Sequence, residues 1–358
     1  MKNKKQKFPF HSILRITKIY FILVGLFISC NLMTDDHHLP ENAMVVTKSG
    51  NWKKAAELSE KWYQKYPKDA EANYQAATNY LKQNSPTKAL QILNSFQPSN
   101  KYFQKEISWR EARLAKAYYM TGQFHKVLEV VKNYSFPKAY RGLAREHLKA
   151  LIQLRQFDEL KKQLGIYQQK GIFRKNGKTT NTDFLFRAIC NELVLVENKN
   201  QLEYYAQTFQ QWIHEDEDTR PSRNLPFANF YLKNYDRAIE LLEKSILEEK
   251  SPRHLMELQM LLGVCFAKKG NEEKANLQIE KIRAMEKLPN RHDAFGAKYY
   301  HQARIELAMK KKTEALKSLN QALDNKAEFW SYKFREDSFL IDLFEDKSFQ
   351  KMITSIGI

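Results

Sequence analysis

The 358-residue chain is short of glycine, proline and cysteine, and each shortage excludes a class of protein. Only 11 glycines and 10 prolines occur, which disfavours a turn-rich β protein and favours long helices. The three cysteines, Cys30, Cys190 and Cys265, are too few for a disulfide framework. Because Cys190 and Cys265 stand far apart in apolar stretches, we expect them to be buried free thiols.

The sequence also lacks the motifs of common catalytic and metal sites. It contains no His-Glu-x-x-His, no cysteine pair at zinc spacing and no Gly-x-Ser-x-Gly. Gly177-Lys178-Thr179 resembles the end of a phosphate-binding loop, but Gly171 stands one residue too far back. The acidic run 215–218 lacks the glycine and closing glutamate of a calcium loop, and His147 has no identifiable partner. We therefore expect no enzyme activity, no cofactor and no metal.

Positive charge is in excess along the whole chain. Lysine and arginine number 59 against 41 acidic residues, giving a net charge of +18. The first 29 residues hold six of these cations and no acid, so the remainder still carries +12. Such a surface suits an acidic partner. The alternative is a set of solvated helix faces, because the basic residues are spread out and alternate with glutamate.

Residues 1–29 have the pattern of an export signal. Residues 2–18 are basic, and the apolar run 19–28 has about ten residues, whereas a membrane-spanning helix needs about 20. The run ends in Phe27-Ile28-Ser29-Cys30, which resembles the lipobox of bacterial lipoproteins, with Phe27 in place of the usual leucine. The resemblance implies lipidation of Cys30, with palmitate-type chains as a stable membrane anchor. An uncleaved signal anchor and ordinary secretion are the alternatives.

Residues 30–49 are expected to form a tether and the start of a first repeat. Asp35-Asp36 resembles the sorting signal of surface-exposed lipoproteins in Bacteroidetes-type bacteria, and a plain linker is the alternative. We expect a lipoprotein of the outer membrane, on its periplasmic or its surface face.

From residue 50 onwards one pattern recurs. A glycine or polar residue makes a turn, an aromatic residue often follows two positions later, and apolar residues then follow at helical spacing. The turns at Gly50, Asn84, Gly122 and Arg155 lie mostly near 34 residues apart. Further turns are expected at Lys233, Gly270 and Lys310. This period, with two amphipathic helices per unit, resembles the tetratricopeptide repeat.

The resemblance implies an all-α protein, a right-handed α-solenoid over residues 50–325. Small residues such as Ala76-Ala77 and Gly263 would let paired helices approach closely. The register lapses near 165–220, where we expect a loop from Gly165 to Asn181 and a degenerate unit with helices at 184–197 and 201–214. Residues 326–358 resemble the capping segment of such arrays, which covers the last apolar face.

In tetratricopeptide proteins the first helix of each unit lines a concave groove. The family register places aromatic and basic side chains inward, which suits a peptide or an acidic segment; ordinary packing between helices is the alternative. The inward residues are Tyr74, Thr78, Lys82, Trp109, Lys116, Tyr119, Arg145 and Lys149. Tyr74 and Thr78 stand where chaperone-binding members have the lysine and asparagine of a carboxylate clamp, so that function is not implied.

The expected function is a non-catalytic scaffold or adaptor for protein–protein interaction. Its partners would be another protein or peptide in the groove, and a membrane through the lipid anchor. One alternative is a lipoprotein that captures a glycan or nutrient for an outer-membrane transporter, and a second is a cytoplasmic regulator. No nucleic-acid partner is expected, because the pattern contains no module that stacks bases or reads a groove.

Overall fold

The computed structural model describes most of the chain after residue 38. The described ranges are 39–49, 52–96, 104–133, 141–169, 182–214, 224–285, 296–325 and 334–355. The export signal with Cys30, the turn at Gly50, the segment 170–181 and the acidic run 215–218 lie outside them. Within these ranges all regular secondary structure is helical, as predicted.

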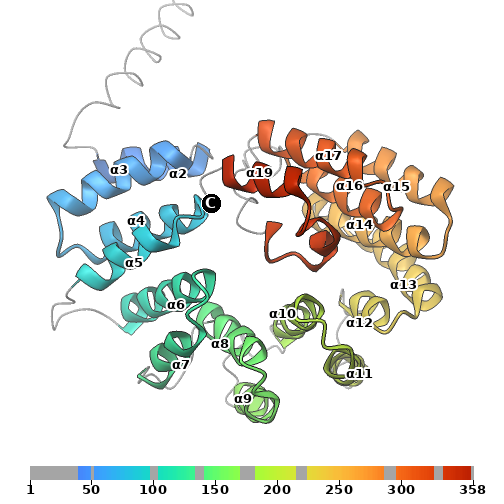
Figure 1. Ribbon diagram of the computed structural model, residues 1–358, viewed down its shortest axis with the longest axis horizontal. Coiled ribbons are helices and arrows are strands. Elements are labelled where there is room, and N and C mark those ends of the chain that lie inside the picture. Colours follow the sequence, from blue (N-terminus) through green and yellow to red (C-terminus); the bar gives the residue numbers. More distant parts are fainter. Residues whose placement is uncertain are drawn as a thin grey trace, which may run out of the picture.

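Eight pairs of consecutive helices follow one another through the described ranges, and two short helices come after them. Figure 1 shows the pairs arranged in succession around an arc, with the C-terminal segment returning along its inner side. The pairs are α2 (Leu39–Ser49) with α3 (Trp52–Lys65), α4 (Ala70–Lys82) with α5 (Pro86–Ser95), α6 (Gln104–Met120) with α7 (Phe124–Lys132), α8 (Arg141–Gln153) with α9 (Phe157–Gln169), α10 (Thr182–Leu195) with α11 (Lys199–His214), α12 (Leu225–Tyr231) with α13 (Tyr235–Glu248), α14 (Pro252–Lys268) with α15 (Glu272–Ala284), and α16 (Ala297–Ala308) with α17 (Lys312–Asp324); η3 (Ser338–Leu343) and α19 (Lys347–Ser355) follow.

Seven of these pairs share one turn. The first helix ends at a residue in the left-handed region, with φ between 55° and 78°, and the next N–H bonds to a carbonyl five residues earlier, as Ser85 does to Tyr80 at 2.8 Å. This is the hydrogen-bond pattern of a Schellman cap, which reverses the chain in the same way each time. The seven residues are Asn84, Gly122, Arg155, Glu197, Lys233, Gly270 and Lys310.

The central region has the two helices expected there, but the residues expected to start the loop are helical. The helices expected at 184–197 and 201–214 are α10 and α11, and their turn at Glu197 has the same geometry as the others. The loop expected from Gly165 is wrong at its start, because α9 continues to Gln169. Leu164 and Tyr167 are buried there, and their apolar contacts hold the last turn of α9 in a helix despite its polar neighbours.

Small residues let neighbouring helices approach closely, as predicted. Ala76 and Ala77 are fully buried in α4. A Cβ atom on Gly263 of α14 would lie 2.6 Å from Cδ1 of Ile305 in α16 and 3.2 Å from Cβ of Gln278 in α15. Glycine is therefore needed where three helices meet.

The C-terminal segment packs its apolar residues against the last helix pair. Leu340, Leu343 and Phe349 are fully buried, and Asp346 caps α19 by accepting from the N–H groups of Ser348 and Phe349. Such a terminal element covers an apolar face that no further repeat would bury.

The described cysteines are buried free thiols, as expected. Burial raises the pKa of Cys190, and it raises that of Cys265 to about 12. None of the helices in the described ranges has the length and hydropathy that crossing a bilayer requires.

Candidate functional site

The inner residues of α4 hold an arginine of the next helix pair. Arg113 of α6 donates from Nε to Thr78 Oγ1 and from Nη2 to Tyr74 Oη, both at 2.9 Å. Its guanidinium carbon lies 5.0 Å from the centre of the Tyr74 ring. Lys82 lies one helical turn beyond Thr78, where burial and the charge of Arg113 lower its pKa to about 8. The side chains of Tyr74 and Thr78 therefore bind Arg113 of the next helix pair.

A buried group of charged side chains, which we call the inner cluster, lies on α6, α8 and α10. It consists of Lys116, Tyr119, Arg145, Glu146, Lys149 and Glu192, and it is joined by Glu336 from the segment before η3. Lys149 Nζ lies 3.1 Å from Glu336 Oε2, and Lys116 Nζ donates to Glu336 Oε1. The predicted groove therefore already receives an acidic side chain, from its own chain.

The charges of the inner cluster balance only when Glu336 is counted. Lys116, Arg145 and Lys149 oppose Glu146, Glu192 and Glu336 in this network. Burial acts to raise the pKa of Glu336, but Lys116 and Lys149 hold it well below its usual range. Burial opposes the charge on Lys149, yet Glu336 and the other neighbours raise its pKa well above the ordinary value.

Lys116 is the weaker cation of the two. Burial lowers its pKa, and the neighbouring charges of Lys149 and Arg145 add to that effect against the pull of Glu146 and Glu336. Its ammonium stays within 4.0 Å of Glu146 Oε2. Lys116 thus depends on its carboxylates to remain charged in a buried position.

The inner cluster contains two buried carboxylate oxygens that have no hydrogen-bond donor among the described residues. Among the described residues, Glu146 Oε2 and Glu192 Oε2 accept no hydrogen bond. Lys149 Nζ stands 3.9 Å from the first oxygen and 3.4 Å from the second, at ion-pair distance, while its hydrogen bond goes to Glu336. The ammonium groups therefore have a second set of acceptors close at hand.

Asn191 of α10 holds the main chain of the incoming segment. Its Nδ2 donates to the carbonyl of Glu336 at 2.7 Å, and its Oδ1 accepts from the N–H of Ser338 at 3.1 Å. Glu336 lies in a turn and Ser338 begins η3, so the Asn191 carboxamide holds the main chain where the turn enters the helix, whatever the side chains of the segment are.

The next residues of the segment are bound by α16 and α12. Arg304 Nε lies 2.7 Å from Asp337 Oδ2, and the Tyr300 hydroxyl donates to the same oxygen. Phe339 stacks on Phe230, with ring centres 5.4 Å apart. Residues 336–339 are thus held in turn by four parts of the arc: the inner cluster, α10, α16 and α12.

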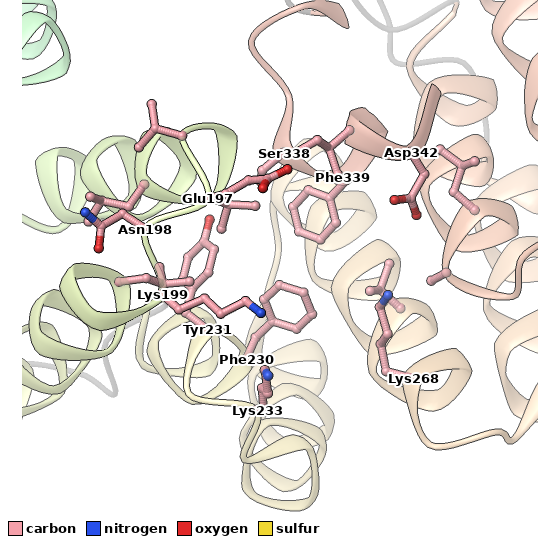
Figure 2. A pocket seen from close by; sticks show the side chains of 18 of the residues that line it. Glu197, Asn198, Lys199, Phe230, Tyr231, Lys233, Lys268, Ser338, Phe339 and Asp342 are labelled. Carbon is pink, nitrogen blue, oxygen red and sulfur yellow. The ribbon is translucent and has the colours of Figure 1, made fainter. Parts of the chain in front are cut away.

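A cavity of about 1030 Å³ opens beside this segment (Figure 2). Phe230, Tyr231 and Phe339 give it aromatic walls, and Lys199, Lys233 and Lys268 stand around it with Glu197 and Asp342. Its lining comes mainly from the helix-pair turns after α10 and α12, from the ends of α14 and α16, and from four residues of η3: Ser338, Phe339, Ile341 and Asp342. The cavity extends the inner surface beyond the part that the segment occupies.

The structure places the described side chains among the predicted inward residues in two groups. Lys116, Tyr119, Arg145 and Lys149 meet in the inner cluster, while Tyr74 and Thr78 hold Arg113 beside Lys82. The side chain of Trp109 lies outside the described residues.

Several residues of the site carry no signal that a sequence pattern picks out. They are Arg113, Glu146, Asn191, Glu192, Phe230, Arg304 and the segment Glu336–Ser338. His147, for which the sequence identifies no partner, has its Nδ1 2.6 Å from the Tyr167 hydroxyl, and burial lowers its pKa to about 4. That contact belongs to the packing of α8 on α9.

Comparison with known proteins adds little to this description. No protein-family model matches the chain, and no curated protein matches it. Among solved structures, the chain is similar to the tetratricopeptide-repeat domain of P58(IPK), at 12% identity and a TM-score of 0.21, over 86% of this chain and 99% of that one. The protein is an all-α repeat solenoid on the basis of its helix pairs and their common turn.

Proposed function

We propose that the protein is a non-catalytic scaffold for protein–protein interaction, tethered to a membrane by lipid on Cys30, whose inner surface binds a short acidic segment of another protein. The observation that carries the proposal is the binding of Glu336–Phe339 on that surface. Its main chain is held by Asn191, its acidic side chains by lysines and an arginine, and its aromatic ring by Phe230.

These contacts are of the kind that recognise peptides. Hydrogen bonds to the main chain supply affinity, and side-chain pockets supply selectivity. The cations of the surface select carboxylates, because an uncharged side chain would leave them with one carboxylate fewer than they have now. The cavity beside Phe339 offers further space for a partner. A binding role is therefore favoured over a catalytic one.

The membrane tether rests on the sequence around Cys30 and is tested by comparing the wild type with Cys30→Ala after cell fractionation. We expect the wild type in the membrane fraction and the variant released or unprocessed. Cys265→Ala, which removes a buried thiol, is the matched control and is expected to stay with the membrane. Equal release of all three proteins would contradict the tether.

The binding surface is tested by photo-crosslinking in cells. A crosslinking amino acid is placed at Lys199 or Lys268 beside the cavity, and at Leu247 of α13, whose side chain is 87% exposed, as a control. We expect the two inner positions to capture the same protein and Leu247 to miss it. Capture of one common set from all three positions, or none from the inner ones, would count against the proposal.

A second candidate function is capture of a glycan or another nutrient for an outer-membrane transporter. The size of the cavity and its aromatic walls favour it, since aromatic rings give apolar contact to a bound ligand. A rise in melting temperature with one member of an oligosaccharide panel would support this alternative.

A further inference from the structure

We propose that residues Arg335–Phe339 are an internal ligand, which a partner replaces with a segment of the same chemistry: two consecutive acidic residues and an aromatic residue two positions after the second. The inference rests on the proposed function and specifies the partner that the inner surface selects. Residues 336–339 provide the template, because each of their contacts with the arc is one that another chain can reproduce.

The internal ligand lies between two apolar anchors. Phe334 is fully buried and stacks on Tyr300, with ring centres 5.3 Å apart, and Leu340 and Leu343 are fully buried in the cap. Between the anchors Arg335 is exposed, and the Glu336 side chain keeps 21% of its surface in solvent. The intervening residues are held mainly by polar contacts and one stacked ring. Asp337 and Ser338 are buried, and Asp337 caps η3, since its Oδ1 accepts from the Phe339 N–H and its carbonyl accepts from the Leu340 N–H. The segment therefore leaves the inner surface as a loop when the first turn of η3 opens, while Phe334 and Leu343 hold its two ends.

The inner cluster is built to tolerate that departure. Without Glu336, Lys149 still has Glu146 Oε2 at 3.9 Å and Glu192 Oε2 at 3.4 Å, and both oxygens otherwise accept no hydrogen bond from the described residues. These acceptors lower the cost of emptying the site, because a buried ammonium without any carboxylate is strongly unfavourable.

The emptied surface would also attract an acid. Three cations of the inner cluster would then face two carboxylates, and Arg304 would lose Asp337. The surface would thus gain positive charge at two places, which two consecutive residues of the template, Glu336 and Asp337, occupy in this structure. Phe230 would lose its stacked ring and offer a place to an aromatic side chain.

The cavity shows where the partner's chain would continue. Ser338, Phe339, Ile341 and Asp342 line it on the side of the C-terminal segment, as Figure 2 shows for three of them. A partner residue in the position of Phe339 therefore stands at the cavity's edge, and the residues after it enter the space between Lys199 and Lys268.

The test measures binding of a labelled peptide with the sequence of residues 335–339, Arg-Glu-Asp-Ser-Phe, to the full chain in detergent by fluorescence anisotropy. We expect Glu336→Ala to bind the peptide at least tenfold more tightly than the wild type does, because its internal competitor lacks the carboxylate. A peptide with Gln and Asn in place of Glu and Asp should bind neither protein. Adding Lys149→Met to Glu336→Ala should remove the gain.

A measurement on the wild type guards against a variant that fails to fold. Excess peptide should speed hydrogen exchange at the Ser338 amide, which Asn191 protects, and leave the amides of α19 unchanged. Equal affinity of the peptide for wild type and Glu336→Ala, or unchanged exchange at Ser338 under saturating peptide, would overturn the proposal. So would a concentration-dependent dimer of Glu336→Ala, since the occupant would then be a second copy.

The two proposals fail separately. A partner captured from Lys199 and Lys268 but no binding of the peptide would leave the scaffold function and remove the internal ligand. Binding of the peptide with no partner captured would leave the internal ligand and remove the scaffold function.

Discussion

Lys149 Nζ lies 3.1 Å from Glu336 Oε2, although 187 residues separate them in the chain. Lys149 belongs to the fourth helix pair, and Glu336 follows the eighth. Repeats of a solenoid normally contact only their neighbours. This ion pair instead joins distant parts of the arc across its inner side, and its contribution to stability is open to measurement.

Removing the acid should destabilise the fold. Glu336→Gln leaves Lys116 and Lys149 short of a buried carboxylate, and we expect the free energy of unfolding to fall by about 2 kcal/mol, below the full range for buried pairs because Glu336 is partly solvated. The double variant with Lys149→Met should lose less than the sum of the single losses. Urea unfolding measures all three. Glu159→Gln, which breaks the exposed pair with Lys162, is the control and should cost under about 0.5 kcal/mol.

Two glycines in helices should respond in opposite directions to a larger side chain. Gly263→Leu forces atoms into Ile305 and Gln278, and overpacking of this kind costs about 1–3 kcal/mol. Gly165→Ala meets nothing within 4 Å, so the better helix propensity of alanine should stabilise α9 by about 0.5–1 kcal/mol. Thermal unfolding followed by circular dichroism compares them. A loss of stability in Gly165→Ala would show that residue 165 is not helical.

Acid should destabilise the protein through His147. Burial lowers its pKa to about 4 in the folded state, whereas an unfolded histidine has a pKa of about 6.5. The unfolded state therefore binds more protons between these values, and stability should fall as pH drops from about 6.5 to about 4, by up to about 3 kcal/mol. Urea titrations of wild type and His147→Gln across this range test it. His125→Gln, on the exposed face of α7, is the control. If the slope stayed the same in His147→Gln but fell in His125→Gln, His147 would not be the cause of the acid effect.

Lys82 should be unusually reactive toward acylating reagents. Burial and Arg113 lower its pKa to about 8, so a large fraction of the amine is unprotonated at pH 8, in contrast with an ordinary lysine of pKa about 10.4. Mass spectrometry of acylation rates against pH should give a midpoint near 8 for Lys82. Arg113→Gln should move that midpoint upward only in part, because burial is the larger cause. A midpoint near 10 in the wild type would rule the effect out.

The fold was predictable because it repeats local signals. Turn residues, small residues such as Ala76-Ala77 and apolar spacing recur along the chain, and a helix pair depends on little else. The unit around α10 and α11 looked degenerate because its turn at Glu197 comes 42 residues after the turn at Arg155, outside the spacing near 34 residues, although both turns have the same geometry. The loop was expected to start at Gly165 because the residues there are mostly polar, and this composition does not reveal that Leu164 and Tyr167 form a buried face of α9.

The site was only half predictable. In the tetratricopeptide register, Lys116 and Lys149 fall at inward positions of their own helices, because residues three or four apart share one face of a helix. What they meet there depends on how far the arc curves, which is a sum of small rotations between units that no local pattern records. Glu336 and Asn191 therefore looked like ordinary surface residues, and their pairing appears only in three dimensions.

Contact between the inner cluster and the C-terminal segment changes how this chain should come apart. A linear array frays from either end, one unit at a time, and its middle is indifferent to the loss. Here Glu336, which follows the eighth helix pair, completes the electrostatics of α6, α8 and α10 in the middle of the array. Opening of the C-terminal segment is thus felt at once in the middle, and the array should melt as a single cooperative unit.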